Sequence, residues 1–332
     1  MECHVTIEGS SYALHDGESV LECLERHGVA MSSSCRSGVC QSCMLRCVGG
    51  EVPLAATKPL RATLREQGYF LSCVCRPTTD LSVTRAEDAI QRVSCTIAEL
   101  TWLNQSILCV RLSPRESFLY SPGQFANFVR PDGTVRSYSI ASLPEVESTL
   151  EFHVASMPNG KMSGWLANEA RVGDALELTG PNGNCFYTRE NLEQPILLVG
   201  TGTGLAPLYG IVRDALQKGH TGPIHLFHGS LFERGLYLVS ELRAMAESYG
   251  NFQFTPCVLN ADGRTDETIS VGAIDGLVSS AYPSLKGWRV YLCGHPDTVK
   301  LLQRKVFLAG ASMKDILADA FLPSATGAAP AQ

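Results

Sequence analysis

The pattern of hydrophobic and polar positions changes twice along the chain. Up to about residue 85, short alternating runs surround a single helical period, and from residue 92 to about 190 short strand-like runs follow one another. From residue 194, bare apolar runs alternate with helical periods. Alternation is typical of half-buried strands, and apolar runs followed by helices are typical of a parallel sheet. Because each pattern needs a core of its own, we expect three domains.

The first part predicts a small mixed unit. A Glu8-Gly9-Ser10 turn joins two strands into a hairpin, Gly28 ends a helix over 19–27, and the last strand is expected at a sheet edge. The strands expected here cover 5–7, 11–14, 71–75 and 80–84.

The second and third parts differ in how strands follow one another. Gly, Pro and Asn punctuate the second part, which is typical of a barrel. Its expected strands are 93–97, 106–112, 124–129, 138–141, 150–154 and 175–179, with a helix over 161–169. In the third part strands and helices alternate, which indicates a parallel α/β sheet. Its expected elements are strands 196–199, 224–227, 252–258 and 289–293 and helices 206–218 and 239–248.

Composition narrows the classes of function. The chain has 332 residues, a net charge of −6 and no run of Lys and Arg, so we expect no nucleic-acid partner. No apolar run approaches the length of a membrane span and no secretory pattern opens the chain, so we expect no membrane partner. The 13 cysteines are odd in number and do not suit a disulfide framework; metal-bound cysteines in the cytoplasm suit the count better.

Four cysteines have the spacing of an iron–sulfur site. Cys35, Cys40 and Cys43 are spaced C-x4-C-x2-C, and Cys73 follows after 29 residues. This is the plant-type [2Fe–2S] spacing, in which a tight loop supplies three thiolates and a distant segment the fourth. The alternative is a zinc site, but zinc prefers two C-x2-C pairs and only one is present here.

The other cysteines do not fit this spacing. Cys47 and Cys75 lie near the loop without matching it. We expect the rest to be small buried hydrophobic residues. They are Cys3, Cys23, Cys95, Cys109, Cys185 and Cys257.

The cysteine loop resembles the N-terminal ferredoxin domain of bacterial oxygenase reductases over about 85 residues. Many relatives place glycine where Gln41 stands. If that position has a positive φ, Gln41 is strained, because only glycine adopts such a backbone freely. This affects the loop geometry and not the assignment of the cluster.

A second set of residues suits a flavin. Arg136 can neutralise a phosphate, Tyr138 on the same side of the strand can lie against a ring, and Ser139 can hydrogen-bond near the flavin N5. The alternative is an ordinary exposed strand edge. Gly160, Met162 and Ser163 open the next predicted helix, and a helix N-terminus suits a pyrophosphate, although ordinary helix capping would also explain the pattern.

These two motifs, in this order, resemble the flavin-binding barrel of the ferredoxin-NADP reductase superfamily. There the R-x-Y-S strand holds the flavin and its phosphate, and the G-x-x-S turn caps the pyrophosphate. The resemblance implies FAD as the flavin. FMN is the alternative, because the sequence does not show whether an adenosine has room.

A third set suits a nicotinamide nucleotide. Gly202, Thr203 and Gly204 lie between an apolar strand and a helix, where glycines allow a phosphate to approach the backbone; the alternative is a tight packing turn. Cys293 and Gly294 end a strand at the carboxyl edge of the same sheet. Both loops resemble the pyridine-nucleotide domain of that superfamily, in which the matching cysteine lies beside the nicotinamide. The alternative for Cys293 is a buried structural cysteine.

Two further positions bear on the nucleotide and the flavin. Ser230 stands where relatives bind the adenosine ribose, and the uncharged Leu231 beside it favours NADH, although Arg234 and Arg243 keep NADPH open. Phe321 resembles an aromatic residue that approaches the flavin near the C-terminus of relatives. The alternative is that Phe321 anchors a last helix in the core.

Together these resemblances cover the chain to about residue 322. They imply a multidomain protein with an α+β ferredoxin (β-grasp) domain, an antiparallel β-barrel flavin domain and an α/β parallel-sheet nucleotide domain. The expected boundaries are 1–86 for the ferredoxin domain, 87–190 for the FAD domain, 191–322 for the NAD(P)H domain and 323–332 for a disordered tail of Ala, Pro, Gly and Ser.

The implied function is an electron-transfer reductase that passes electrons from NADH through FAD to the [2Fe–2S] cluster. Its expected partner is the terminal oxygenase, or a separate ferredoxin, of an aromatic-ring dioxygenase or monooxygenase system, and its expected catalytic residues are Ser139 and Cys293. One alternative is a reductase serving a deoxysugar dehydrase. Another is a non-catalytic iron–sulfur module on an inactive reductase scaffold.

Overall fold

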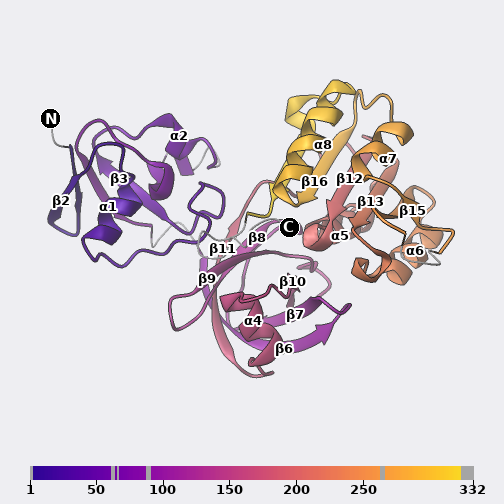
Figure 1. Cartoon of the computed structure of the whole chain (residues 1–332), viewed down its shortest axis with the longest axis horizontal. Helices are drawn as coiled ribbons and strands as arrows, with labels where there is room; N and C mark the ends of the chain where they lie inside the picture. Colours follow the sequence, from indigo (N-terminus) through magenta and orange to yellow (C-terminus); the bar gives the residue numbers. More distant parts are fainter. Residues whose placement is uncertain (1–2, 61–63, 66, 87–90, 262–265, 323–332) are drawn as a thin grey trace.

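The computed structural model describes residues 3–60, 64–65, 67–86, 91–261 and 266–322. Figure 1 shows three bodies, each built on its own sheet: an N-terminal unit in indigo, a barrel in magenta and a C-terminal unit in orange and yellow. The three-domain fold class is therefore confirmed. The domain boundaries stay predictions, since part of the first linker (87–90) and the expected tail (323–332) lie outside the described residues.

The first sheet has the order β2-β1-β5-β3-β4. The predicted hairpin is present as antiparallel β1 and β2, and the predicted helix α1 begins after Ser19, whose side chain caps it together with Glu22. The elements are β1 (Cys3–Ile7), β2 (Ser10–Leu14), α1 (Val20–Arg26), β3 (Met44–Gly49), α2 (Leu54–Thr57), β4 (Tyr69–Leu71) and β5 (Leu81–Arg85).

Two expectations for this sheet are wrong. β5 lies in the middle of the sheet, between β1 and β3, because its parallel pairing with β1 places Leu81 and Val83 in the core. The expected strand over 71–75 ends at Leu71 and is followed by a 3-10 turn. Ser72 forms this turn by donating both its backbone N–H and its hydroxyl to the carbonyl oxygen of Cys43, at 3.2 and 2.7 Å.

The second sheet is an antiparallel barrel with the order β10-β7-β6-β11-β8-β9. A bridge between Ile140 and Phe152 brings its two ends together. Its elements are β6 (Gln91–Trp102), β7 (Ile107–Pro114), β8 (Phe125–Val129), β9 (Val135–Ser139), β10 (Leu150–Ala155), α4 (Lys161–Asn168) and β11 (Ala175–Asn182). All six predicted strands and the predicted helix are present. The strand expected over 138–141 begins earlier, at Val135.

The third sheet is parallel, with the order β15-β14-β13-β12-β16-β17. One face packs against α5 and α6 and the other against α7 and α8, so the sheet has a core on each side. The elements are β12 (Ile196–Thr201), α5 (Leu205–Gln217), β13 (Ile224–Ser230), α6 (Val239–Ser248), β14 (Phe252–Val258), β15 (Ser270–Val271), α7 (Ile274–Ala281), β16 (Arg289–Gly294), α8 (Pro296–Leu308) and β17 (Ile316–Ala320).

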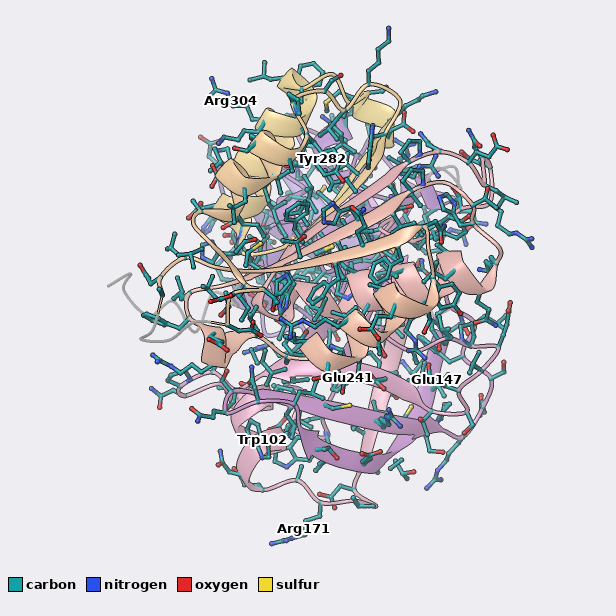
Figure 2. The ribbon with its side chains drawn as sticks, turned by 90° about the vertical axis from the view of Figure 1, so that its right-hand side faces the viewer. Trp102, Glu147, Arg171, Glu241, Tyr282 and Arg304 are labelled. Atoms are coloured by element: carbon teal, nitrogen blue, oxygen red, sulfur yellow. The ribbon has the colours of Figure 1, made fainter. Side chains whose placement is uncertain are left out.

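The barrel packs closely against α5 of the C-terminal unit. A Cβ at Gly123 of the barrel would lie 2.6 Å from the Ile211 side chain of α5, and one at Gly210 of α5 would lie 3.1 Å from the carbonyl oxygen of Ala141. Figure 2 shows this junction from the side, with Glu147 and Glu241 at the level where the two units meet. Arg213 of α5 reaches across it to Glu147, at 2.9 Å. The close approach brings the predicted flavin and nucleotide residues together.

In the part of the chain that the structure describes, every helix is too short or too polar to cross a membrane.

Candidate functional site

The four predicted cluster ligands gather in two pairs. Cys35 and Cys40 lie on one loop, where the backbone N–H of Cys40 points at the Cys35 sulfur (3.3 Å) and that of Cys35 at the Cys40 sulfur (3.5 Å). Cys43 and Cys73 form the second pair, close enough for each thiol to shift the pKa of the other. The 3-10 turn that replaced the expected strand is what presents Cys73 to the loop.

Hydrogen bonds in the loop favour a thiolate at Cys35. The Cys40 thiol, with the backbone N–H groups of Cys40 and Ser37, holds the pKa of Cys35 below its ordinary value in spite of its burial. The thiolate is the form of cysteine that binds a metal, and N–H groups aimed at sulfur also tune the potential of a bound cluster.

The arrangement fits two irons better than one zinc ion. In a tetrahedral zinc site all four sulfurs crowd around one centre. Here, among the described residues, no three of these four sulfurs lie within 4.8 Å of one another, whereas each pair is close. Two pairs of thiolates are the donor set that a plant-type [2Fe–2S] cluster uses.

The cluster loop depends on left-handed backbone at three positions. Arg36 has φ of 53°, Gly38 of 80° and Gln41 of 59°. Gln41 therefore does adopt the left-handed backbone under which the sequence analysis expects it to be strained. Cys47 and Cys75 stay outside the loop: the Cys47 thiol donates to the carbonyl oxygen of Gly49, and Cys75 is buried in the core.

The flavin strand β9 forms an edge of the barrel sheet. Tyr138 packs edge-on against Phe128, with ring centroids 4.8 Å apart, and burial raises the pKa of its hydroxyl. Arg136 is half-buried on the same strand. The Ser139 hydroxyl donates to Oδ2 of Asp319, at 3.2 Å. The structure therefore ties the flavin strand to β17.

The start of α4 can hold an anion through its backbone. No side chain caps this helix, and a Cβ at Gly160 would lie 2.2 Å from Oγ of Ser163. The Ser163 hydroxyl accepts from the backbone N–H of Met157, which shapes the turn before the helix. Uncapped N–H groups at a helix start are suited to a phosphate. The side chain of Met162 is fully buried in the barrel core, so any part it has in binding a cofactor falls to its backbone.

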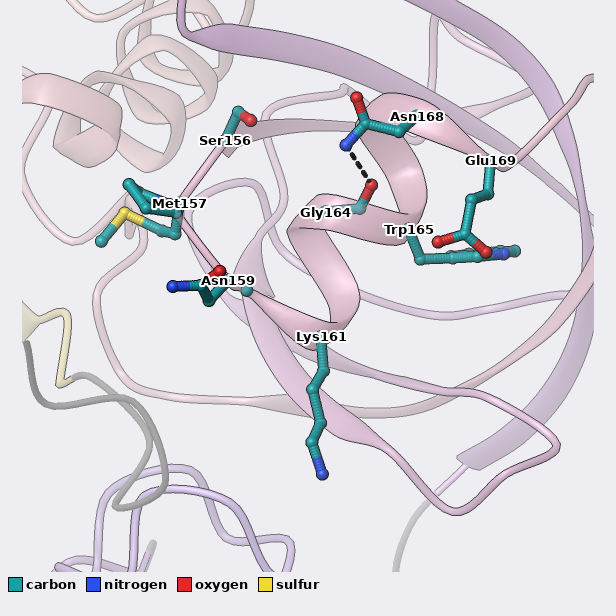
Figure 3. A pocket seen from close by; sticks show the side chains of 10 residues that line it. Ser156, Met157, Asn159, Lys161, Gly164, Trp165, Asn168 and Glu169 are labelled. Atoms are coloured by element: carbon teal, nitrogen blue, oxygen red, sulfur yellow. Dashed lines mark hydrogen bonds between the residues drawn. The ribbon is translucent and has the colours of Figure 1, made fainter.

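A surface hollow of about 570 Å³ adjoins this helix start (Figure 3). It is bounded by the turn before α4 and by the side of the helix, including Met157, Lys161 and Trp165. Asn168 closes one end by donating to the carbonyl oxygen of Gly164, at 2.8 Å. The hollow includes Gly160 but neither Arg136 nor Tyr138, so it adjoins only the expected pyrophosphate end of the flavin site.

The two predicted nucleotide loops pack directly on each other. A Cβ at Gly204 would lie 2.3 Å from the carbonyl oxygen of Cys293, and one at Gly294 would lie 2.5 Å from the Thr201 hydroxyl. Gly202, with φ of 54°, has open space where a side chain would stand. Glycine is thus required at 204 and 294 for contact between the loops, while Gly202 leaves room for a ligand.

Cys293 lies at the centre of this region but is almost fully enclosed. Its sulfur is 3.6 Å from that of Cys185, and burial together with Cys185 raises its pKa well above the ordinary value. At 1% exposure it packs in the core that faces the barrel. The raised pKa keeps this thiol in its protonated form. Cys185, expected to be a simple buried residue, is therefore part of this region.

The C-terminal strand adds a residue that the sequence analysis did not assign. β17 pairs with β16 so that Asp319 lies opposite Cys293, and the Phe321 N–H donates to the carbonyl oxygen of Gly294, at 2.8 Å. Burial raises the pKa of Asp319 to about 6. Phe321 therefore follows a strand and not the helix considered as its alternative. The only signal for Asp319 was its position two residues before Phe321.

The ribose end of the nucleotide site carries little free positive charge. Ser230 is half-buried at the end of β13, and Leu231 is 61% exposed. Arg243 is engaged by Asp266, at 3.2 Å, and Arg234 lies over the ring of Phe232.

The remaining cysteine expectations mostly hold. Cys23, Cys95, Cys109 and Cys257 are buried, but Cys3 is only half-buried, because it lies at the start of β1 and donates to the carbonyl oxygen of Thr79.

Comparison with protein families divides the chain in the same order. Residues 5–78 match the 2Fe-2S iron-sulfur cluster binding domain, residues 95–187 the oxidoreductase FAD-binding domain, and residues 198–304 the oxidoreductase NAD-binding domain. The three cofactor classes predicted from the motifs are thus the ones that these families bind.

Individual relatives span nearly the whole chain. The naphthalene 1,2-dioxygenase system ferredoxin–NAD(P)+ reductase component of Pseudomonas putida is 33% identical, over 92% of this chain and 94% of the relative. The aromatic O-demethylase reductase subunit of an Amycolatopsis species is 32% identical, over 89% and 91%. The crystal structure of an Amycolatopsis cytochrome P450 reductase superposes with a TM-score of 0.71 at 31% identity, covering 97% of this chain and 99% of that one.

With matching domains in the same order and relatives of this identity over nearly its full length, the chain belongs to the family of oxygenase-system reductase components that join a [2Fe–2S] ferredoxin domain to FAD- and NAD-binding domains.

Proposed function

We propose that this protein oxidises NADH and delivers the electrons one at a time to the terminal oxygenase, or to a separate ferredoxin, of a system that attacks an aromatic compound. The names of similar proteins support this proposal, because they describe reductase or electron-transfer components of naphthalene, phenol, toluate and xylene oxygenase systems. We expect it to act in the cytoplasm, where free cysteines persist.

One observation carries the proposal: the predicted flavin and nucleotide residues converge. Ser139 of the flavin strand is hydrogen-bonded to Asp319, and Asp319 pairs with Cys293 at the end of β16. Gly204 packs on the same segment. Transfer between two bound cofactors needs their reacting atoms to lie in contact, and this convergence supplies one place for both.

In this proposal the side chains bind and orient the cofactors. Arg136 and the start of α4 hold the phosphates of the flavin, Tyr138 lies against its ring, and Gly202 leaves room for the nucleotide. Flavin and cluster supply the redox chemistry, since a flavin accepts an electron pair and a [2Fe–2S] cluster carries single electrons. Cys35, Cys40, Cys43 and Cys73 would hold the cluster.

We favour NADH over NADPH because of the ribose end of the site. Recognition of a 2′-phosphate needs a basic side chain. Leu231 offers none, and Arg243 is already paired with Asp266.

Steady-state assays with two acceptors test the proposal. A small acceptor such as ferricyanide can take electrons from the flavin, whereas a protein acceptor needs the cluster. We expect NADH to support both reactions at a higher kcat/KM than NADPH does. We expect Cys73→Ser to keep ferricyanide reduction and to lose reduction of the protein acceptor. Equal rates of protein reduction by Cys73→Ser and the unchanged protein would contradict the proposed route.

A further inference from the structure

A buried hydrogen bond joins the flavin barrel to the nucleotide domain away from the cofactor motifs. His153 of β10 places Nδ1 3.2 Å from the hydroxyl of Tyr237, in the segment between β13 and α6. The two rings meet edge to face, with centroids 5.3 Å apart. Both side chains are almost fully buried, at 3% and 3% exposure, so water does not compete for the bond.

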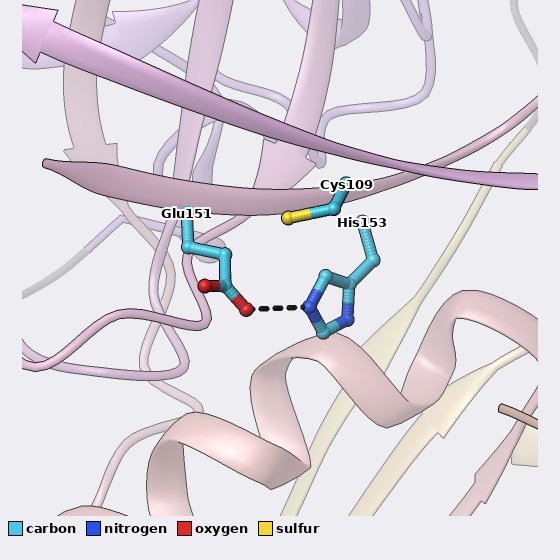
Figure 4. A group of neighbouring side chains, drawn as sticks. All are labelled: Cys109, Glu151 and His153. Carbon is cyan, nitrogen blue, oxygen red and sulfur yellow. Dashed lines mark hydrogen bonds and ion pairs between the residues drawn. The ribbon is translucent and has the colours of Figure 1, made fainter. Parts of the chain in front are cut away.

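Further hydrogen bonds continue from His153 into the barrel. Nε2 of His153 lies 2.9 Å from Oε1 of Glu151 (Figure 4). Arg111 donates to Oε2 of Glu151 at 2.7 Å. Burial would raise the pKa of Glu151, but His153 and Arg111 hold it below its ordinary value, so the carboxylate is ionised. An ionised carboxylate only accepts, so Nε2 of His153 donates to Glu151. Nδ1 is thereby turned toward the hydroxyl of Tyr237, which can donate or accept.

Cys109, Glu151 and His153 are residues of the kinds that bind metal ions, but their hydrogen bonds argue against a metal site. Donor atoms of Cys109, Glu151 and His153 lie within 4.8 Å of one another. Both nitrogens of His153 and both oxygens of Glu151 are already hydrogen-bonded, however, and Arg111 brings a positive charge to the same carboxylate. A cation would have to displace these bonds and oppose that charge. These side chains are therefore better explained as a hydrogen-bonded bridge between the two domains.

Tyr237 anchors a segment that borders the nucleotide site. Residues 231–238 connect the predicted ribose position at Ser230 to α6. A second barrel side chain holds the same segment, since Nδ2 of Asn104 donates to the carbonyl oxygens of Gly235 and Leu236, at 3.2 and 3.4 Å. The segment is thus fastened to the barrel at Tyr237 and at the two residues before it.

Tyr237 also supports the glycine loop through His228. The His228 ring packs edge to face on Tyr237, with centroids 5.3 Å apart, and its Nε2 donates to the carbonyl oxygen of Gly202, at 3.1 Å. Burial lowers the pKa of His228 to about 4, so the ring is neutral. Tyr237 therefore lies between a histidine of the barrel and a histidine that holds the nucleotide loop.

We propose that His153 and Tyr237 are positioning residues for the nucleotide: their bond fixes the ribose segment and, through His228, the glycine loop at a set place on the flavin barrel. The inference rests on the proposed NADH-oxidising function and adds to it two residues that touch neither cofactor motif. Its consequence is that the bond stabilises the complex with NADH, and the retention of the flavin does not depend on it.

The chain offers a matched control for testing this bond. Tyr187 and His220 form a second buried tyrosine–histidine bond, 3.1 Å long and likewise edge to face at 87°. It joins the segment after β11 to the turn that follows α5, and its hydrogen bond involves none of the predicted nucleotide residues. Tyr237→Phe and Tyr187→Phe each remove one hydroxyl and, with it, one hydrogen bond to a buried histidine.

The experiment measures stopped-flow flavin reduction against NADH concentration for the unchanged protein, Tyr237→Phe and Tyr187→Phe. We expect Tyr237→Phe to raise the NADH concentration at half-saturation on the order of fivefold, the effect of one hydrogen bond of ordinary strength, with flavin content unchanged. Tyr187→Phe should leave it unchanged. His153→Gln, which keeps an acceptor for Tyr237 and a donor for Glu151, should recover part of the affinity lost in His153→Ala.

The outcomes separate the inference from the proposed function. If NADH reduces the flavin of the unchanged protein but both tyrosine variants have the same half-saturation, the inference is wrong and the function stands. If NADH does not reduce the flavin of the unchanged protein, the proposed function itself fails. Loss of flavin from Tyr237→Phe alone would also overturn the inference, because the bond would then support the flavin and not the nucleotide.

Discussion

The hydroxyl of Ser139 donates to the carboxylate of Asp319 at 3.2 Å, and this bond joins an edge strand of the barrel to the last strand of the nucleotide sheet. The two residues are 180 positions apart in the sequence. While Asp319 is ionised, it accepts from Ser139 and leaves the Ser139 oxygen free to accept an N–H of a flavin. When Asp319 is protonated, it can donate to the Ser139 oxygen as well as accept from it, so the direction of the bond is no longer fixed.

Asp319→Asn should therefore change the pH dependence of activity. The pKa of Asp319 is raised to about 6, so the unchanged protein should lose NADH–ferricyanide activity as the pH falls through about 6. Asp319→Asn should have a lower kcat, on the order of 10-fold, with no inflection near that pH. An unaltered pH profile in the variant would remove Asp319 from the mechanism.

The same pKa predicts an effect on stability. A carboxyl with a raised pKa keeps its proton in the native chain where the unfolded chain has released it, so native stability falls as the pH rises from about 4 to about 6. Asp319→Asn removes this cost. The gain in melting temperature should be larger at about pH 7.5 than at about pH 5. A gain that is the same at both pH values would argue that Asp319 does not titrate in this range.

Cys73→Ser should abolish the cluster, and Cys47→Ser should not. Cys73 pairs with Cys43, whereas the Cys47 thiol only donates to a backbone carbonyl oxygen. Iron content and visible absorption of both variants, purified without oxygen, measure this. We expect two irons per chain in Cys47→Ser, as for any intact [2Fe–2S] centre. An iron-replete Cys73→Ser would require a different fourth ligand.

Gly204→Ala should separate the two nucleotide loops. Its Cβ would overlap the carbonyl oxygen of Cys293, which is backbone and cannot turn away. Because small misplacements of reacting groups are costly, kcat/KM for NADH should fall about 100-fold while the flavin stays bound. The control is Gly276→Ala in α7, where the new methyl group meets open space. If both variants keep full activity, Gly204 is not in the nucleotide site.

Gln41→Val should weaken the cluster loop more than Gln41→Gly does. With φ of 59°, position 41 is unfavourable for a β-branched side chain and favourable for glycine. Cluster absorption followed during a denaturant titration reports the free energy of unfolding of the loop. This free energy should decrease in the order Gly, Gln, Val, with steps of about 1 kcal/mol. Val retaining the cluster as well as Gly would show that the loop relaxes to a different backbone.

What the sequence revealed depends on how local each feature is. The spacing of Cys35, Cys40 and Cys43 is set by one loop around one cluster, so a short stretch of sequence is enough to predict it. The question of backbone strain at Gln41 could be raised for the same reason, since Gln41 lies in that loop. β5 was misplaced at the sheet edge because its partners β1 and β3 are distant in the chain, and pairing of that kind leaves no local pattern.

Asp319 and His153 were missed for a related reason. Each is a single polar residue in a short strand, and its role comes from a partner on another domain: Ser139 for Asp319, and Tyr237 for His153. Met162 was assigned from its place in a motif, yet the pitch of α4 turns its side chain into the barrel core. The motifs were enough to predict the classes of cofactor. The contacts between the predicted flavin and nucleotide residues depend on how the domains pack, which the motifs do not show.

The most direct test of the whole account is the visible spectrum of the oxygen-free protein during titration with NADH. The account predicts that flavin and cluster bands both bleach as NADH is added, because electrons pass from the nucleotide through the flavin to the cluster held by Cys35, Cys40, Cys43 and Cys73. A protein whose bands do not respond to NADH, or one that lacks flavin and cluster absorption altogether, would contradict it.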